Sequence, residues 1–161
     1  MNISEYNRCV DEVADGLYRF LLKNTKEREL ARDLVQEAFL RLWERHKDVQ
    51  TEKGKSWLFT TAYRAMIDYF RKNSRMEALE TSKHNTGIVN HGYSDLKEIL
   101  NKAVEQLPEI QRSVIMLRDY EGYSYHEIGE ITGLNDNQVK VYIFRARMFL
   151  KKFIGKPEVV I

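Results

Sequence analysis

The sequence predicts an all-α protein built from two small helical domains joined by a flexible linker. Only two prolines and eight glycines occur among 161 residues, so few residues would interrupt helices. Apolar residues recur at the spacing of amphipathic helices before and after residues 76–93, whereas within that stretch the periodicity fails. We therefore expect one domain at 1–75 and another at 94–161. The second is expected to be a four-helix domain that contains a helix-turn-helix.

The first domain is predicted to contain helices near residues 4–23, 26–46 and 55–74. Cys9 shares an apolar helix face with Tyr6, so we expect it to fill the core. As the single cysteine of the chain it cannot form an internal disulfide, which fits a reducing cytoplasm. The second helix is predicted to bury Leu30, Leu34, Ala38 and Leu42, and the third to bury Leu58, Ala62, Ala65, Met66 and Tyr69.

The outward side of the second helix combines acidic side chains with an apolar centre. It carries Asp33, Gln36, Glu37, Leu40 and Glu44, with Trp43 at its margin. Such a surface would repel nucleic acid and suits contact with a basic protein partner. From these residues alone, an acidic face that is merely solvated is the favoured interpretation of the two.

The third helix has a cationic stripe that begins with a tryptophan. Its members are Trp57, Thr61, Arg64, Asp68, Arg71, Lys72 and Arg75. We expect Trp57 to be exposed, which is costly unless something stacks on it. Single-stranded bases are a suitable partner, because they stack on aromatic rings while cations follow the backbone. The alternative, equally weighted, is that Trp57 caps the core and the cations are solvated.

Residues 76–93, MEALETSKHNTGIVNHGY, have the composition of a linker, because Gly, Asn, Ser, Thr and His accumulate there. Ser94 is a suitable N-cap for a helix that runs through Gln106. Pro108 then interrupts the helical pattern, and a further helix is expected from about residue 109 to residue 120.

The stretch from Tyr120 to Lys152 predicts two short helices joined by a tight turn, as in a helix-turn-helix. Gly133 stands where the turn needs a positive φ, and Gly129 would let the two helices approach closely. Asn135 or Asp136 can cap the second helix. The predicted buried stripe of that helix is Val139, Ile143, Ala146 and Leu150, and its outward side carries Asn137, Lys140, Val141, Phe144, Arg145 and Met148.

This outward side suits a DNA groove. Its amide and cationic side chains offer hydrogen bonds to bases or phosphates, and its apolar side chains suit thymine methyl groups. Positive charge gathers there, since residues 140–156 hold six basic residues and no acid although the net charge of the chain is only +2. The alternative is a plain amphipathic hairpin with a solvated basic face, which would not need both glycines and the basic run.

The residues give no support to an enzyme, a metal site or a cofactor site. The chain has no phosphate-binding glycine loop, no CxxC and no HExxH, and His84 and His91 lack companions at ligand spacing. No apolar run approaches the ~20 residues that span a bilayer, and the N-terminus lacks the hydrophobic region of a signal peptide. We therefore expect a cytoplasmic protein that is not inserted in a membrane.

Three segments together resemble the bacterial sigma factors of the sigma-70 family, in particular its small, two-domain extracytoplasmic-function (ECF) group. They are DLVQEAFLRLWERH (33–46), WLFTTAYRAMIDYFRKNSR (57–75) and LPEIQRSVIMLRDYEGYSYHEIGEITGLNDNQVKVYIFRARMFLKK (107–152). The resemblance implies a subunit of RNA polymerase that recognises the minus-ten and minus-thirty-five promoter elements and promotes DNA melting. A stand-alone helix-turn-helix transcriptional regulator is the alternative.

The resemblance also implies a role for each surface. Sigma region 2, at 1–75, would dock on the β′ coiled coil of core RNA polymerase through Asp33, Gln36, Glu37, Leu40 and Trp43. The same region would bind the opened minus-ten strand through Lys53, Lys55, Trp57, Thr61, Arg64, Asp68, Arg71, Lys72 and Arg75. Sigma region 4, at 94–161, would read duplex DNA at minus thirty-five through Asn137, Gln138, Lys140, Val141, Phe144 and Arg145. Further implied partners are the polymerase β flap and an anti-sigma factor.

Overall fold

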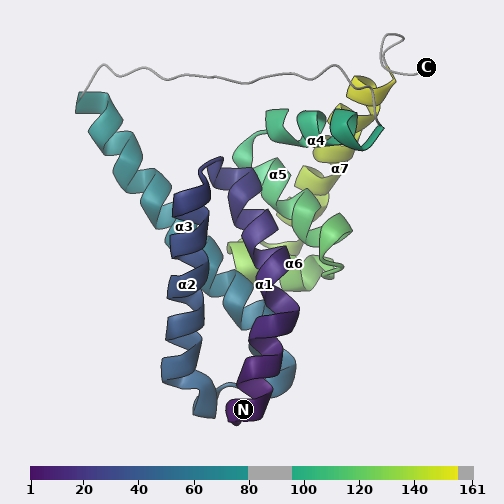
Figure 1. Ribbon diagram of the computed structural model, residues 1–161. Coiled ribbons are helices and arrows are strands. Elements are labelled where there is room, and N and C mark those ends of the chain that lie inside the picture. Colours follow the sequence, from purple (N-terminus) through teal and green to yellow (C-terminus); the bar gives the residue numbers. More distant parts are fainter. Residues whose placement is uncertain (80–95, 156–161) are drawn as a thin grey trace.

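The protein is a set of helices in two groups, as the sequence predicts. The computed structural model describes residues 1–79 and 96–155, and within these ranges the regular structure is entirely helical (Figure 1). The first group consists of α1 (Ile3–Thr25), α2 (Arg28–Arg45) and α3 (Gly54–Leu79). The second consists of α4 (Leu96–Gln106), α5 (Glu109–Ile115), α6 (Tyr125–Thr132) and α7 (Asp136–Ile154).

Helix α1 begins and ends where its local sequence requires. The Asn2 side chain accepts a hydrogen bond from the Glu5 backbone N–H, and the Glu5 carboxylate accepts one from the Asn2 N–H, both at 2.8 Å. These bonds satisfy donors that a helix start otherwise leaves free. The apolar stripe of α1 packs against α2 and α3, and Leu17, Phe20 and Leu21 are fully buried. Cys9 lies in this core, as predicted.

The helix-turn-helix formed by α6 and α7 has the expected turn chemistry. Gly133 ends α6 with φ +85°, a conformation that favours glycine. A Cβ atom at Gly129 would lie 2.7 Å from the Leu134 carbonyl oxygen, so only glycine allows the turn to pass this close. Asn135 caps α7, with its side chain accepting from the Gln138 N–H at 2.8 Å.

Two predicted boundaries shift. Helix α3 continues to Leu79, so the first four residues of the predicted linker are helical; residues 80–93 and the predicted cap Ser94 lie outside the described ranges. The helix expected from 109 to 120 is α-helical only to Ile115 and finishes as a π-helical turn, Met116–Tyr120. That turn changes the direction of the chain before α6.

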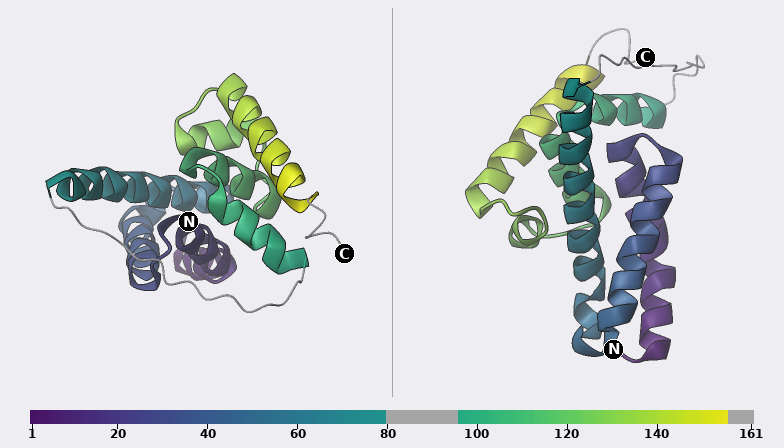
Figure 2. Two further views of the ribbon diagram at one scale, coloured as in Figure 1. Left: turned by 90° about the horizontal axis from the view of Figure 1, so that it is seen from above. Right: turned by 90° about the vertical axis from the view of Figure 1, so that its left-hand side faces the viewer.

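The two groups of helices contact one another through α3 and α1. In both views of Figure 2, α1 and α2 lie on one side of α3, while α6 and α7 lie on the other. Helix α6 packs along α3, and α5 contacts α1. The Phe59 ring joins the two units, because it packs edge-on against Phe20 of α1 at 5.6 Å and against Tyr123 at 5.7 Å between ring centroids. The buried residues therefore form one continuous cluster.

Candidate nucleic-acid and partner interfaces

Helix α7 presents its predicted reading side openly. Val139, Ile143 and Ala146 are buried against the other helices of the second unit, as the stripe predicts, and Leu150 is half-buried. On the opposite side all six predicted minus-thirty-five residues are exposed: Asn137, Gln138, Lys140, Val141, Phe144 and Arg145. The Phe144 side chain is 64% exposed, which is unusual for a large apolar residue and leaves it available for contact with a partner.

A shallow cavity of about 290 Å³ lies at the N-terminal end of this surface. Asn137, Gln138, Val141 and Arg145 line it, together with the cap Asn135. The Arg145 guanidinium lies 5.8 Å from the centroid of the Tyr142 ring, a cation–π contact that holds its stem along the helix. Amides, a cation and apolar groups thus share one open face. Duplex DNA offers matching acceptors and methyl groups in its major groove.

Helix α3 presents its cations, but Trp57 differs from the prediction. Arg64, Asp68, Arg71, Lys72 and Arg75 are exposed along the helix. Trp57 is half-buried and packs against the core, so the expectation of an exposed tryptophan was wrong. This matches the alternative in which Trp57 caps the core.

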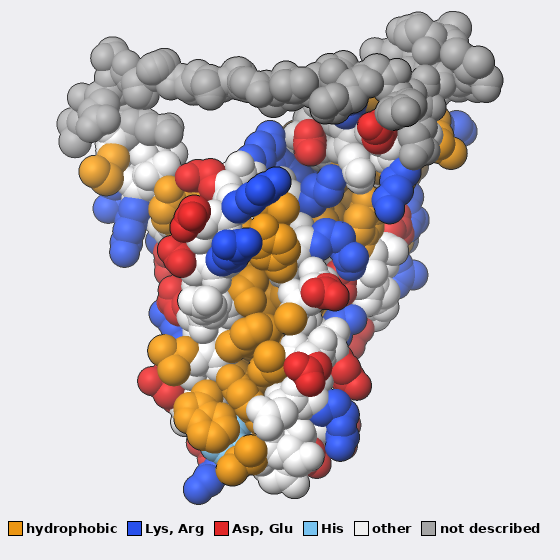
Figure 3. Space-filling view, in the orientation of Figure 1, with side chains coloured by type: hydrophobic (Ala, Val, Ile, Leu, Met, Phe, Trp, Pro, Cys, Tyr) orange, Lys and Arg blue, Asp and Glu red, His pale blue; other side chains and the backbone are white. Residues whose placement is uncertain are grey.

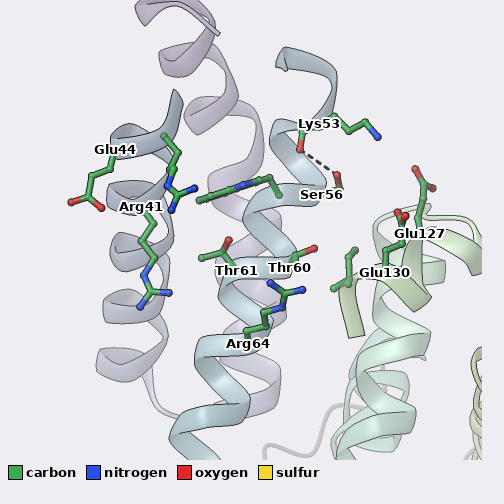
Figure 4. A pocket seen from close by; sticks show the side chains of 12 residues that line it. Arg41, Glu44, Lys53, Ser56, Thr60, Thr61, Arg64, Glu127 and Glu130 are labelled. Atoms are coloured by element: carbon green, nitrogen blue, oxygen red, sulfur yellow. Dashed lines mark hydrogen bonds between the residues drawn. The ribbon is translucent and has the colours of Figure 1, made fainter. Parts of the chain in front are cut away.

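A cavity of about 610 Å³ separates α2, α3 and α6 at this point. Figure 4 shows Thr61 and Arg64 of α3 between Arg41 on α2 and the carboxylate of Glu130 on α6. Trp57 lines the same cavity, so its remaining accessible surface faces this space. One wall is therefore basic and polar, and the wall contributed by the second unit is acidic.

The two remaining predicted minus-ten residues are Lys53, just before α3, and Lys55, in the first turn of α3. Lys53 is exposed at the mouth of the cavity, where it extends toward Glu127 (Figure 4). Lys55 is half-buried; its Nζ lies 3.5 Å from the Glu121 carboxylate and donates to the Glu121 carbonyl oxygen at 3.3 Å. Glu121 also accepts a hydrogen bond from Arg19 of α1 at 2.8 Å. A predicted DNA-binding lysine is thus paired within the protein.

The sequence prediction missed a second apolar stripe on α3. Phe59 and Tyr63 are buried, and Ile67 and Phe70 are half-buried against the core. These positions recur at helical spacing on a side of α3 different from the stripe that begins at Leu58. A helix with apolar residues on more than one side is expected to be covered on more than one side. That signal was present in the sequence and would have predicted a second contact surface for α3.

The predicted partner face on α2 is open. Asp33 and Gln36 are exposed, Glu37 is half-buried, and Leu40 and Trp43 are 58% and 41% exposed. The Trp43 ring stacks on His46 with 4.5 Å between centroids, and Tyr6 packs edge-on against it at 5.1 Å. Figure 3 shows a strip of apolar side chains along the face formed by α1 and α2. Apolar groups framed by acids suit a protein partner better than nucleic acid.

Neither a membrane span nor a metal centre is found in residues 1–79 and 96–155. None of the helices there combines the length and apolar character needed to cross a bilayer. In the same ranges, no group of three or more His, Cys, Asp or Glu side chains is placed to hold a metal ion.

Known proteins match this chain over both groups of helices. Residues 9–76 match sigma-70 region 2, and residues 97–150 match sigma-70 region 4. The ECF RNA polymerase sigma factor SigM of Bacillus subtilis (strain 168) is 32% identical, with 91% of this chain and 96% of that protein covered. The RNA polymerase sigma factor YlaC of the same organism is 28% identical, with 88% and 87% covered.

Solved structures share the fold. The sigma factor RpoE from Bartonella quintana, in complex with the anti-sigma factor NepR, aligns with a TM-score of 0.80 and 23% identity, covering 96% of this chain and 99% of that one. CnrH, in complex with the cytosolic domain of CnrY, aligns with a TM-score of 0.66 and 22% identity over 95% and 89% of the two chains. Because regions 2 and 4 match in order over most of the chain, and the 32% identical SigM is covered along nearly its whole length, the chain belongs to the ECF group of the sigma-70 family and is an RNA polymerase sigma factor.

Proposed function

We propose that this sigma factor divides its work among three surfaces on two domains, 1–75 and 94–161. The α2 face around Leu40 and Trp43 docks on the β′ coiled coil of core RNA polymerase. The cationic side of α3 and the loop before it hold the opened minus-ten strand. The outward side of α7 reads the minus-thirty-five element as duplex, with the second domain seated on the β flap. The observation that carries the proposal is the chemical difference between the faces of α2 and α7, one acidic with an apolar centre and the other basic.

Because polymerase holds both domains, neither domain needs to bind its DNA element tightly by itself. When both domains are held on one large partner, binding of the second DNA element becomes effectively intramolecular. Residues 80–95 can extend over at most about 55 Å, at ~3.5 Å per residue, which is enough to let the domains reach separate sites. Melting then proceeds by capture, because bases stacked on Trp57 offset the few kcal/mol of lost stacking and pairing. This mechanism requires no covalent chemistry or cofactor from the chain.

An anti-sigma factor is the further partner that we propose, and the cytoplasm is the proposed site of action. The solved neighbour RpoE was captured with the anti-sigma factor NepR, and CnrH with the cytosolic domain of CnrY. The open apolar surface around Trp43 provides a place for a competing protein to bind. Purification of a tagged copy from its host, with and without the inducing stress, would test for an inhibitor that leaves on induction.

Reconstitution with core RNA polymerase tests the main proposal. We expect a stable complex that initiates transcription at a specific promoter, whereas a stand-alone helix-turn-helix regulator would bind DNA without polymerase and give no such initiation. Leu40→Asp should abolish binding to core polymerase while leaving the helical circular dichroism spectrum unchanged. Met76→Asp is the matched control, because Met76 on α3 is 60% exposed, close to the 58% of Leu40. Normal polymerase binding by Leu40→Asp would refute the α2 assignment.

A further inference from the structure

We propose that the second domain carries a built-in competitor for the opened promoter strand. The turn between α5 and α6 places a carboxylate and an aromatic ring against Lys55 at the N-terminal end of α3, within the surface where the minus-ten strand is proposed to bind. The free protein is then closed at this site and has to open before it can capture DNA. This inference rests on the proposed function of α3 and adds to it a closed state with named contacts.

Glu121 is the central residue of the closed state. Its side chain is only 7% exposed, and it lies between Arg19 of α1 and Lys55 of α3. Arg19 Nη2 donates to Oε2 at 2.8 Å, and Lys55 Nζ lies 3.5 Å from Oε1. A buried carboxylate is costly unless cations and hydrogen bonds compensate it, and here both cations come from the other domain. The closed arrangement therefore satisfies a charge that the second domain brings with it.

Tyr123 places an aromatic ring beside the same lysine. Its ring is 6% exposed, lies 5.2 Å from Lys55 Nζ and packs edge-on against Phe59. Lys55 thus meets a negative oxygen on one side and an aromatic face on the other. A single strand offers the same two groups, a phosphate and a base. Glu121 and Tyr123 therefore occupy the surface around Lys55 that the promoter strand would occupy in the open complex.

The competing turn is rigid within its own domain. Gly122, between the two contact residues, adopts φ +77°, a conformation that favours glycine. Arg118 donates to the Tyr123 carbonyl oxygen at 2.8 Å, and the Tyr123 N–H donates to the Leu117 carbonyl oxygen at 3.1 Å. These bonds lie inside the second domain, so the turn is preorganised before the domains meet. Preorganisation lowers the entropic cost of closing.

Carboxylates of α6 extend the same pattern along the cavity. Glu127 and Glu130 line the wall opposite Arg64, and Lys53 stands at the mouth (Figure 4). The pKa of Glu127 is lowered first by the hydrogen bond from the Ser124 N–H, and further by the nearby charges of His126 and Lys53. These contacts favour the ionised form of Glu127, which faces the proposed strand-binding surface.

Geometry requires this state to open for promoter recognition. Helix α6 packs against α3 and α7 packs against α6, so the two DNA-facing helices lie about 20 Å apart at ~8–10 Å per helix pair. The two promoter elements are separated by about 25 base pairs, or about 85 Å at ~3.4 Å per base pair. The closed protein cannot reach both. The faces of α2 and α7 stay uncovered, so polymerase can dock on α2 first and opening can follow.

Energy transfer between two dyes tests closure directly. Cysteines replace the exposed residues Glu29 on α2 and Lys151 on α7, in a Cys9→Ala background that removes the native thiol. The dye-labelled protein without further substitutions should show high energy transfer. Glu121→Gln should lower it, because the neutral side chain loses both ion pairs while keeping its shape. Asp119→Asn is the matched control, since its partner Arg147 at 2.7 Å belongs to the same domain, and it should leave transfer unchanged.

The second arm measures binding of a fluorescein-labelled, 12-nucleotide single-stranded DNA of mixed sequence without polymerase. Because a closed fraction reduces apparent affinity in proportion, Glu121→Gln should bind about 5- to 10-fold more tightly than the parent, and Asp119→Asn equally to it. Arg19→Ala provides a second opening variant on the other domain, in case Glu121→Gln alters the fold of the second. It should reproduce both changes.

The outcomes separate this inference from the proposed function. Unchanged transfer and unchanged strand affinity in both Glu121→Gln and Arg19→Ala, with normal polymerase binding and initiation, would overturn the closed state alone. Lower transfer in these variants without gain in strand affinity would show that the domains close but do not compete with DNA, which also overturns the inference. Absence of a polymerase complex in every variant would instead reject the proposed function.

Discussion

Helices α3 and α7 carry the proposed DNA-binding residues of the two domains, yet the protein treats them differently. Helix α7 buries one apolar stripe and leaves the opposite side open, with Phe144 64% exposed. Helix α3 buries apolar residues on two sides, and its N-terminal end lies under α6. The side of α7 that is proposed to read duplex DNA is therefore open, whereas part of the α3 surface that is proposed to hold unpaired bases faces α6 across a cavity.

The largest predicted difference comes from one phenylalanine on each helix. Phe59→Ala removes a fully buried ring that contacts both domains, so the free energy of unfolding should fall by about 3–5 kcal/mol. Phe144→Ala removes an exposed ring, so stability should change by no more than about 0.5 kcal/mol while duplex binding weakens. Urea unfolding of both variants measures this. Similar destabilisation by the two substitutions would contradict the division into a covered and an open helix.

Arg145→Ala should weaken promoter use by about 10-fold or more, since a base contact of this kind contributes about 1–3 kcal/mol. The loss should be greatest on promoters that depend on the upstream element. Arg147→Ala is the control on the same helix, because Arg147 pairs with Asp119 inside the domain at 2.7 Å and should affect initiation less. Equal loss on promoters that lack the upstream element would argue against base reading by Arg145.

Gly16→Ala tests whether crowding Glu121 from α1 opens the contact between the two domains. Alanine favours helix by about 1 kcal/mol relative to glycine in the interior of α1. In the closed state, however, a Cβ atom at Gly16 would lie 3.0 Å from both carboxylate oxygens of Glu121. We expect domain 1–75 to become more resistant to heat while dye transfer between the domains falls. A more stable variant with unchanged transfer would show that the carboxylate adjusts without opening.

The smallest effect is predicted for the outer ion pair between the domains. Lys23 Nζ lies 3.9 Å from Glu105, whose side chain is 50% exposed. Solvent screens such a pair, so Glu105→Gln should change the free energy of closing by less than about 0.5 kcal/mol. Dye transfer at two salt concentrations provides the measurement. If Glu105→Gln lowered dye transfer as much as Glu121→Gln does, the main contact between the domains would be the Lys23–Glu105 pair and not Glu121.

The helices and their faces could be predicted from the sequence because each depends on neighbours three or four residues apart. The stripe Val139, Ile143 and Ala146 is buried and the side with Lys140 and Arg145 is open, as the period required. The fold class and the family followed from these local patterns. Which segment covers the second apolar side of α3 could not be deduced in this way, since α6 lies far along the chain.

By itself, the sequence determined where the helices lie to within a few residues, which side of each is apolar and where charge gathers. Tertiary structure alone decided that Glu121 lies between Arg19 and Lys55, residues 102 and 66 positions away. The physical reason is range. Helix caps and stripes arise from contacts within a turn or two and leave a periodic trace, whereas packing of one domain on another joins distant residues whose spacing in the sequence has no period.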